Sequence, residues 1–440
     1  MIENRQDMLK IGIRHEDKYE SETRTPLIPI DIQRLINDDG IDITVESSNK
    51  RVYQDDDFRN AGAHIGSLDH CDIIIGVKEV PIYKISPSKV YLIFSHVIKG
   101  QKDNMPSLKK MMELNVTLID YEKIVDEHGK RLIFFGRYAG LAGKINSLWT
   151  LGKRLAYLGL ETPFLHIRQA RTYHSLEEAK QAVGSLSQMI KSGGLSQLNF
   201  PLVIGFTGNG NVSKGAWEIM DLLPVREISN DQLLTLQKTG HWDDHCIYKV
   251  VFTEKEMVKP RDASKSFDLI PYYANPSIYE SDFEKYLDKI TLLVNGAYWD
   301  DRYPRIVTKN YLRRHYNDQH PLKVIADISC DANGSIECTE FCTKPEDPVF
   351  VYNPLEDKAI QGFDHDGLLV MAVDILPSEL PKDSSAGFSS ALFPYIEQLS
   401  KIDFSLPFEL SSFPEPLKKA TILYKGELTT DFEYLRRFLD

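Results

Sequence analysis

Titratable side chains stand directly after several apolar, strand-length segments in the first third of the chain. They are Lys78-Glu79 after residues 71–77, Ser95-His96 at the end of residues 89–95, Tyr121-Glu122 after residues 115–120, and Arg14-His15-Glu16-Asp17 at the end of residues 8–14. Ligands of open parallel sheets bind beyond the carboxyl ends of the strands, so these side chains are predicted to share one sheet edge. An amine, an imidazole and carboxylates gathered there can transfer protons and pair charges. Each residue alone fits a solvated loop equally well, and only their convergence favours a functional site.

Two arginines belong to the same group. Arg24 lies in the loop ESETRTP after the first strand segment, and Arg131 opens the segment RLIFFG (131–136), which is predicted as a sixth strand. Lys78, His96 and an arginine acting together are the strongest candidate for chemistry in this part of the chain.

A glycine-rich turn follows the apolar segment PLVIG (201–205), and a helix is predicted after the turn. Its residues are Gly208, Asn209, Gly210, Asn211 and Val212. Gly208 and Gly210 permit a tight turn and close approach of the backbone to a pyrophosphate, which would face the helix N-terminus. Ser213 stands where the usual third glycine would be. With a strand before it and a helix after it, this turn predicts a dinucleotide site.

The type of dinucleotide depends on the end of the next strand, in LPVREISND. Glu227 lies 19 residues after Gly208, where an acid favours a ribose 2′-hydroxyl and hence NAD. Arg226 and Ser229 are instead the groups expected around the 2′-phosphate of NADP. The spacing leaves both cofactors open.

The apolar pattern predicts an α/β protein of two Rossmann-like domains with parallel sheets and an interdomain cleft. Leucines and isoleucines at three- or four-residue spacing outline a long helix from Gly140 to Gly159, which separates two series of strands. The predicted strands are 8–14, 41–47, 71–77, 89–95, 115–120 and 131–136, then 201–208, 246–252, 290–296, 322–329 and 368–375. The predicted domains are 1–147 with 376–440 for substrate and catalysis, and 148–375 for the dinucleotide.

Composition excludes several classes of protein. Of the 440 residues, 42% are hydrophobic and 26% charged, which is typical of a soluble globular protein. The formal net charge of −12 argues against nucleic acid or an anionic membrane as a partner. No apolar run reaches the roughly 18 residues of a membrane helix. The N-terminus, MIENRQDMLK, does not resemble a signal or transit peptide, and five cysteines, an odd number, predict a reducing compartment.

No metal site is predicted. The segment HWDDHC (241–246) holds two histidines four residues apart beside a cysteine, but it lacks a further ligand at a characteristic spacing. Cys330, Cys338 and Cys342 have no zinc-like pairing and are predicted to be reduced thiols.

The chain also resembles a known family. The segments that carry the resemblance are IRHEDKYESETRTPL, IIIGVKEVP, FSHVIKGQKDNM, LIDYEKIVDEHGKRLIFFGRYAGLAG, TPFLHI, FTGNGNVSKGA, VNGAYW, DISCDANGSIE and VDILPSELP. In this order, from about Ile11 to the C-terminus, they look like the lysine–2-oxoglutarate reductase half of the bifunctional α-aminoadipic semialdehyde synthase family. More distantly, the chain is similar to the lysine-forming saccharopine dehydrogenases of fungi and to the alanine dehydrogenase and transhydrogenase group.

The resemblance implies roles for individual residues. The matching residues are Lys78 and His96 as catalytic acid–base groups, Arg24 and Arg131 as carboxylate-binding arginines, Glu22, Glu79 and Glu122 as acids around that site, Gly208 and Gly210 in the dinucleotide turn, and Asp374 in DILP beside the nicotinamide.

The activity implied by the resemblance is a reductive condensation in lysine degradation. Lysine and 2-oxoglutarate form an imine, and a nicotinamide, expected to be NADPH with NAD as the alternative, reduces the imine to saccharopine. The partners expected are these small molecules, together with a second copy of the chain or a separate saccharopine-oxidising enzyme. The expected location is the cytoplasm, or the mitochondrial matrix if the chain is part of an organellar bifunctional enzyme. Two alternatives stay open: an opine or alanine-type dehydrogenase with another amine or keto acid, and a dinucleotide-binding sensor without turnover.

Overall fold

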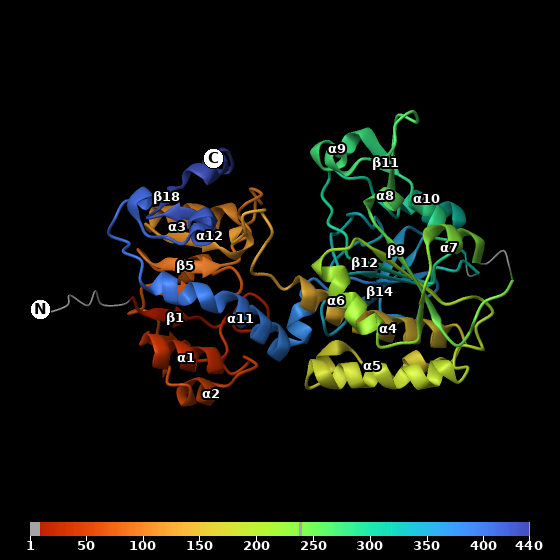
Figure 1. Ribbon diagram of the computed structural model, residues 1–440, viewed down its shortest axis with the longest axis horizontal. Coiled ribbons are helices and arrows are strands. Elements are labelled where there is room, and N and C mark those ends of the chain that lie inside the picture. Colours follow the sequence, from red (N-terminus) through yellow and green to blue (C-terminus); the bar gives the residue numbers. More distant parts are fainter. Residues whose placement is uncertain (1–8, 237–239, 318, 440) are drawn as a thin grey trace, which may run out of the picture. The chain divides into compact units, whose positions relative to one another are not determined.

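The computed structural model describes residues 9–236, 240–317 and 319–439, which divide into two compact units (Figure 1). The first unit comprises residues 1–135 and 381–440, and the second comprises residues 136–380. Among the described residues, no helix is long and apolar enough to cross a membrane.

The first unit is built on an eight-stranded sheet in the order β18-β17-β6-β5-β4-β1-β2-β3. Its strands are β1 (Ile11–Ile13), β2 (Ile43–Val45), β3 (His64–Ile65), β4 (Ile73–Ile75), β5 (Val90–Ile93), β6 (Thr117–Asp120), β17 (Thr421–Tyr424) and β18 (Glu427–Leu428). β1 to β6 pair in parallel, and β17 and β18 add an antiparallel edge beside β6.

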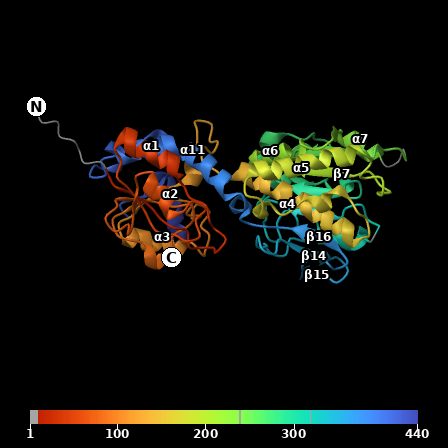
Figure 2. The same cartoon turned by 90° about the horizontal axis from the view of Figure 1, so that it is seen from below.

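Two apolar cores cover the two faces of this sheet, because its central strands are apolar at every position. Ile73 and Ile75 of β4 pack on the face covered by α1 (Pro29–Asp39) and α11 (Pro381–Ser400), while Ile74 points to the face covered by α3 (Met105–Glu113). Figure 2 shows α1 and α11 on one side of the unit and α3 on the other. The short helices α2 (Asp55–Asn60) and α12 (Glu415–Ala420) complete the first of these layers.

The second unit contains another eight-stranded sheet, in the order β15-β14-β16-β13-β12-β7-β9-β8. Its strands are β7 (Val203–Thr207), β8 (Val225–Glu227), β9 (Ile247–Phe252), β12 (Leu292–Asn295), β13 (Val324–Asp327), β14 (Val349–Asn353), β15 (Lys358–Gln361) and β16 (Leu368–Met371). All pair in parallel except β14 and β15, which form an antiparallel edge.

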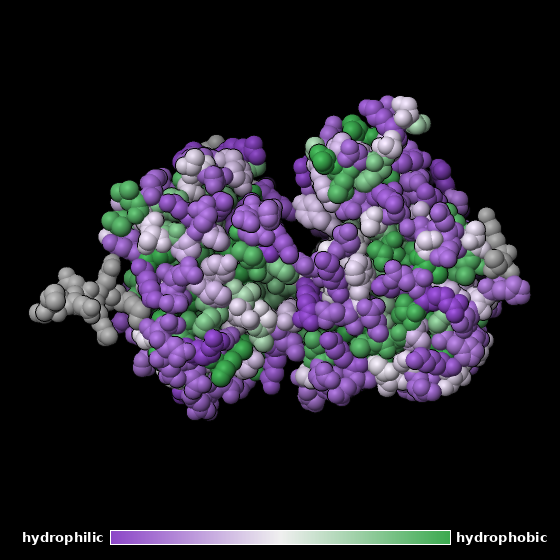
Figure 3. Space-filling view, viewed as in Figure 1, coloured by the Kyte–Doolittle hydropathy of each residue, from purple (hydrophilic) through white to green (hydrophobic). Residues whose placement is uncertain are grey.

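Helices cover both faces of the second sheet (Figure 1). They are α4 (Gly136–Tyr157), α5 (Leu176–Lys191) and α6 (Asn211–Met220) on one side, and α7 (Asn230–Leu236), α8 (Glu254–Met257), α9 (Leu269–Ala274) and α10 (Lys309–His315) on the other. A small hairpin of β10 (Val258–Pro260) and β11 (Tyr279–Ser281) flanks α9, over which apolar side chains are exposed (Figure 3).

The helices α4 and α6 lie unusually close together, which explains two glycines. A Cβ on Gly140 would lie 1.9 Å from the carbonyl oxygen of Val212, and one on Gly215 would lie 2.1 Å from that of Arg137. Because of this packing α4 belongs wholly to the second unit, so the observed boundary falls at residues 135 and 136, whereas the sequence predicts 147 and 148. The second boundary falls at residues 380 and 381, against a predicted 375 and 376.

The prediction of a strand at residues 131–136 is wrong. Arg131 makes only an isolated bridge to Val125, and α4 begins at Gly136. The place beside β6 is taken by β17, and Phe135 instead stacks on Phe388 of α11 with ring centroids 4.4 Å apart. The antiparallel strands and β3 are also missing from the sequence prediction.

Lys144, in the middle of α4, is buried without a hydrogen-bond partner for its Nζ atom among the described residues. The Nζ atom lies 5.3 Å from the centre of the Phe206 ring. Burial lowers the pKa of this amine to about 7, because no anion compensates for the lost hydration.

We predict that Lys144→Met stabilises the protein, and does so more at pH 6 than at pH 10. The folded pKa of about 7 lies below the unfolded value, so the folded state resists protonation of Lys144. The resulting penalty is complete below pH 7 and disappears as the pH rises towards the unfolded pKa. At about 1.4 kcal/mol per pKa unit, the gain at pH 6 is on the order of 4 kcal/mol. Urea unfolding at both pH values measures it, with exposed Lys191→Met as the control; equal or lower stability of Lys144→Met at pH 6 would contradict the prediction.

Candidate active site

Lys78 and His96 lie on loops that follow the neighbouring strands β4 and β5, and Glu79 connects these loops. Glu79 Oε1 is 2.7 Å from His96 Nδ1 and 2.6 Å from Lys18 Nζ. Burial opposes ionisation of Glu79, but hydrogen bonds and charge from His96 and Lys18 outweigh it and lower the pKa of the carboxyl to about 2. The structure therefore brings Lys18, Glu79 and His96 into one charged cluster beside the Lys78 backbone.

A buried carboxylate fixes each of the two loops. Glu16, which follows β1, accepts hydrogen bonds from the backbone N–H groups of Val77 at 2.6 Å and Lys78 at 2.9 Å. Asp120, the last residue of β6, accepts from the backbone N–H and the hydroxyl of Ser95. Burial raises the pKa of both carboxyls, so each depends on these donors to stay in place.

His96 adopts a strained backbone conformation with φ of +52°. The hydrogen bonds of Ser95 to Asp120 precede it, and Asn104 Nδ2 donates to its carbonyl oxygen at 3.0 Å. A left-handed conformation costs about 1–3 kcal/mol and persists only where its surroundings impose it. These hydrogen bonds therefore fix the backbone that carries the His96 imidazole.

The pKa of the Lys78 amine is lowered. Burial is the largest cause and the Arg24 guanidinium adds to it, while Glu22 and Glu79 act in the opposite direction. The Lys78 Nζ atom lies 5.8 Å from the centre of the Tyr19 ring. A lysine with a lowered pKa can exchange protons closer to neutral pH than an ordinary one.

Glu22 and Arg24 form a buried bidentate pair. Arg24 Nε donates to Glu22 Oε1 at 2.7 Å and Nη2 donates to Oε2 at 2.5 Å, and the guanidinium lies 4.1 Å from the centre of the Phe135 ring. Burial alone would raise the pKa of Glu22, but Arg24 and Lys78 lower it. Glu22 thus occupies two donors of the arginine expected to bind substrate carboxylates.

Glu122 and Arg131 form a second pair, with Arg131 Nη2 2.9 Å from Glu122 Oε1. The Arg131 side chain is 49% exposed and stands on a loop. Asp120 accepts a hydrogen bond from the Glu122 backbone, so this pair is attached to the carboxylate that fixes the His96 loop.

Sequence reasoning names Glu16 without a role and does not name Lys18 or Asp120 at all. Asp120 closes the apolar segment NVTLID, and a carboxylate at the end of a buried strand is the signal that could have singled it out.

The glycine turn of the second unit leaves open space in front of helix α6. Gly208 has φ of +79°, and a Cβ there would lie 3.1 Å from the Ala297 backbone, so glycine is required. Gly210 precedes α6 and has no atom within 4 Å of where a Cβ would stand, which leaves open space at a helix N-terminus. Ser213, at the usual third glycine position, is buried, and its hydroxyl donates to the carbonyl oxygen of Thr207. Asn209 lies in the turn, and Asn211 and Val212 are the first two residues of α6.

The strand order separates this turn from the strand that carries Arg226 and Glu227, two residues expected near the ribose. β9, and not β8, is the neighbour of β7, and the Gly208 N–H donates to the carbonyl oxygen of Phe252 at the end of β9. On the edge strand β8, Arg226 pairs with Asp243 at 2.7 Å, while Glu227 pairs with Lys249 at 3.1 Å.

Several other residues lie just after the carboxyl ends of β8, β9 and β16. Ser229 caps α7 by accepting from the Gln232 backbone. Thr253 and Glu254, which the sequence analysis does not name, follow β9, and Glu254 Oε1 accepts from the Tyr273 hydroxyl at 2.8 Å. Asp374 is exposed shortly after β16, at the carboxyl edge of the same sheet.

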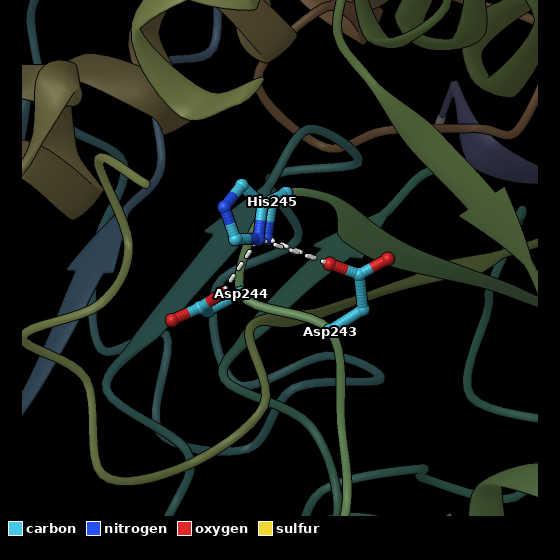
Figure 4. Close-up of side chains that lie close together, drawn as sticks. All are labelled: Asp243, Asp244 and His245. Carbon is cyan, nitrogen blue, oxygen red and sulfur yellow. Dashed lines mark hydrogen bonds and ion pairs between the residues drawn. The ribbon is translucent and has the colours of Figure 1, made fainter. Parts of the chain in front are cut away.

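Asp243, Asp244 and His245 gather their side chains at one turn (Figure 4). His245 Nδ1 is 2.8 Å from Asp244 Oδ1 and 3.4 Å from Asp243 Oδ1. The other oxygen of Asp243 is paired with Arg226, and the backbone N–H of His245 donates to Asp243. The contacts to His245 thus lie within the turn before β9, and that of Asp243 to Arg226 reaches the edge strand β8.

The fold and the glycine turn define the class: a two-unit α/β protein of the dehydrogenase type. The chain matches the family models "Alanine dehydrogenase/PNT, N-terminal domain" over residues 12–142 and "Alanine dehydrogenase/PNT, C-terminal domain" over residues 276–431, together more than half of its length. The chain belongs to the alanine dehydrogenase/PNT family, and this membership implies a nicotinamide dinucleotide cofactor.

Comparison with known sequences confirms the resemblance to α-aminoadipic semialdehyde synthases. The chain is 40% identical to that of Arabidopsis thaliana and 33% identical to the mitochondrial one of Mus musculus, over 97% of its length in both. It spans only 41% and 47% of those two proteins. It is also 27% identical to the saccharopine dehydrogenase [NAD(+), L-lysine-forming] of Emericella nidulans, over 89% of this chain and 92% of that one.

A solved structure of an L-alanine dehydrogenase shares the fold. The two superpose with a TM-score of 0.64 at 16% sequence identity, covering 98% of this chain and 100% of that one.

We predict that Glu22→Gln destabilises the protein by about 3 kcal/mol, because removing one partner leaves a buried guanidinium without its anion. The lowered pKa of Glu22 means that its contribution is present above the unfolded pKa and is lost as the pH falls below it. The difference between wild type and variant should therefore shrink under acid conditions. Urea unfolding measures it, with the exposed Glu20→Gln as the control. Equal stabilities of Glu22→Gln and Glu20→Gln at neutral pH would refute the prediction.

Proposed function

We propose that the protein condenses L-lysine with 2-oxoglutarate and reduces the imine to saccharopine with a nicotinamide cofactor. The observation that carries the proposal is the Glu79–His96 contact together with Lys78, whose pKa is lowered, on the loops after β4 and β5, in a chain that also holds a glycine turn before α6. The names of its relatives agree with this activity. The chain covers under half of the bifunctional relatives, and the proposal concerns the lysine-forming reaction alone.

His96 is the proposed general base, and Glu79 determines which ring nitrogen it offers. A carboxyl with a pKa of about 2 is ionised at neutral pH and can only accept a hydrogen bond, so His96 Nδ1 must carry the proton in the contact of 2.7 Å. The Nε2 atom is then left with its lone pair, able to take a proton from the attacking ε-amine of lysine.

Lys78 is the proposed partner for the second proton transfer, at the carbinolamine that loses water. Its lowered pKa suits a group that gives and regains a proton near neutral pH. Arg24 and Arg131 are the proposed contacts for substrate carboxylates, with Glu22 and Glu122 as the acids that hold them or receive a substrate ammonium. The nicotinamide, when bound, supplies the hydride; the turn from Gly208 to Val212 and the residue Asp374 are the proposed contacts to it.

The proposed reductant is NADPH, in keeping with the resemblance, and Arg226 and Ser229 are its proposed phosphate contacts. NADH is the second candidate, favoured by one observation: the strand beside the glycine turn is β9, and the acid Glu254 follows it. An acid at the end of that neighbouring strand favours a free ribose 2′-hydroxyl.

The proposed location is the cytoplasm, or the mitochondrial matrix if the chain is part of a longer organellar enzyme, as the name of the Mus musculus relative suggests. The proposed partners are the small-molecule substrates, with a second copy of the chain or a separate saccharopine-oxidising enzyme as protein partner.

We predict that Lys78→Met and His96→Gln each lower kcat by about 10²–10⁴-fold, because each removes a proton-transfer group, while nucleotide binding persists. The controls are Lys109→Met and His128→Gln, at exposed positions in the same unit. The assay follows oxidation of NADPH or NADH with lysine and 2-oxoglutarate. Failure of the wild type to oxidise either nucleotide would reject the proposed reaction; turnover with pyruvate or another amine instead would identify an opine or alanine-type enzyme, and nucleotide binding without turnover a sensor.

We predict that Arg226→Ala lowers kcat/KM for NADPH about tenfold, the loss of about 1.4 kcal/mol of phosphate binding, and leaves that for NADH unchanged. Glu254→Ala is measured beside it with both nucleotides. The opposite pattern, in which Arg226→Ala has no effect and Glu254→Ala raises the use of NADPH, would assign the ribose contact to the end of β9 and the cofactor to NADH.

A further inference from the structure

Two cysteines of the second unit, Cys330 and Cys342, lie beside each other near the carbonyl of Ala372, which follows β16. The Cys330 Sγ atom lies 2.8 Å from the Ala372 oxygen, and the backbone N–H of Thr343, beside Cys342, donates to the same oxygen at 2.7 Å. The Cys342 Sγ atom is 3.3 Å from the Cys330 carbonyl oxygen. The Cys342 thiol therefore lies against the Cys330 backbone, and the ionisation of each thiol affects that of the other.

Their surroundings give the two thiols different properties. Cys342 is exposed, and the neighbouring Cys330 lowers the pKa of its thiol although burial acts against this. The same contact and burial raise the pKa of Cys330. A thiolate is the nucleophile in oxidation, so Cys342 is the thiol placed to react first and Cys330 the one placed to resolve the product.

The backbone conformation and hydrogen bonds of Cys330 restrict its position. Its φ is +55°, a left-handed conformation, and Asp327 Oδ1 accepts from its backbone N–H at 3.3 Å. The preceding Ser329 hydroxyl donates to the Ala297 oxygen at 2.7 Å. The Cys330 thiol therefore extends from a fixed loop. Formation of a disulfide then requires movement mainly of Cys342.

We propose that Cys342 and Cys330 are a peroxide-reactive pair that closes to an intramolecular disulfide. The Cys342 thiolate attacks one oxygen of a hydroperoxide, the O–O bond breaks, and a sulfenic acid and water (or an alcohol) are produced after proton uptake. The Cys330 thiol then attacks the sulfenic sulfur, an S–S bond forms, and a second water leaves with the Cys330 proton. The hydroperoxide is reduced by two electrons, which the two thiols supply.

The pair stands at the carboxyl edge of the sheet that carries the glycine turn. Asp374, the proposed contact to the nicotinamide, acts electrostatically on both thiols and is therefore close to them. A disulfide here would fix the loop after β13 to the segment before β14, beside Asp374. We expect oxidation to weaken nicotinamide nucleotide binding about tenfold, a consequence that rests on the proposed function.

The test treats the reduced full chain with hydrogen peroxide at neutral pH, blocks the remaining thiols with an alkylating reagent, and maps the peptides by mass spectrometry. We expect two of the five thiols to escape alkylation, a Cys330–Cys342 cross-linked peptide, and full reversal by dithiothreitol. Cys342→Ser abolishes the cross-link, Cys330→Ser leaves a sulfenic acid on Cys342 that dimedone traps, and the control Cys246→Ser behaves as wild type.

Two results would overturn the proposal: both thiols staying open to alkylation after peroxide treatment, or Cys342 oxidising to a sulfinic acid or joining a second molecule without the internal cross-link. The mapping on the wild type decides this even where a serine variant does not fold. Binding of NADPH and NADH is measured before and after oxidation. Equal binding in the two states would reject the effect on the cofactor, whereas absence of binding to the reduced protein would instead reject the proposed function and leave the cross-link standing.

Discussion

Hydrogen bonds from two loops to the buried carboxylates Glu16 and Asp120 are the interactions on which the candidate active site depends. Glu16 accepts the amides of Val77 and Lys78, and Asp120 accepts the amide and hydroxyl of Ser95. Burying an ionised carboxylate is costly unless donors surround it, as the raised pKa values of both groups indicate. The same bonds that satisfy these carboxylates fix the directions in which Lys78 and His96 leave the sheet edge.

Charged side chains act in turn on His96 and Lys78, which these two loops carry. Glu79 is ionised and holds one imidazole nitrogen, while the Glu22–Arg24 pair stands near Lys78 with both signs of charge. Because Arg24 lowers the pKa of Lys78 and Glu22 raises it, a ligand that drew Glu22 away from Arg24 would change the proton affinity of the lysine. In the proposed reaction, a substrate carboxylate bound by Arg24 would therefore change the proton affinity of Lys78 through this pair.

The central strands and the site loops can be predicted from sequence, because β1, β4 and β5 are apolar throughout and titratable residues follow them. The short edge strands cannot, since β3 and β18 have two residues each and no periodicity to detect. RLIFFG has the composition of a strand, but its place beside β6 is taken by β17, some 300 positions away in the chain. The ribose contacts stay a prediction for the same reason: Arg226 follows the glycine turn in sequence, while the spatial neighbour of β7 on that side is β9, an order that only tertiary packing sets.

Amide hydrogen exchange of Val77, Lys78 and Ser95 tests the central claim most directly, in the wild type and in Glu16→Gln. The account predicts that all three amides are protected in the wild type, and that Glu16→Gln speeds exchange at Val77 and Lys78 while Ser95, bonded to Asp120, keeps its protection. Wild-type amides that exchange as fast as those of an open loop, or a variant in which Val77 and Lys78 stay fully protected, would contradict it.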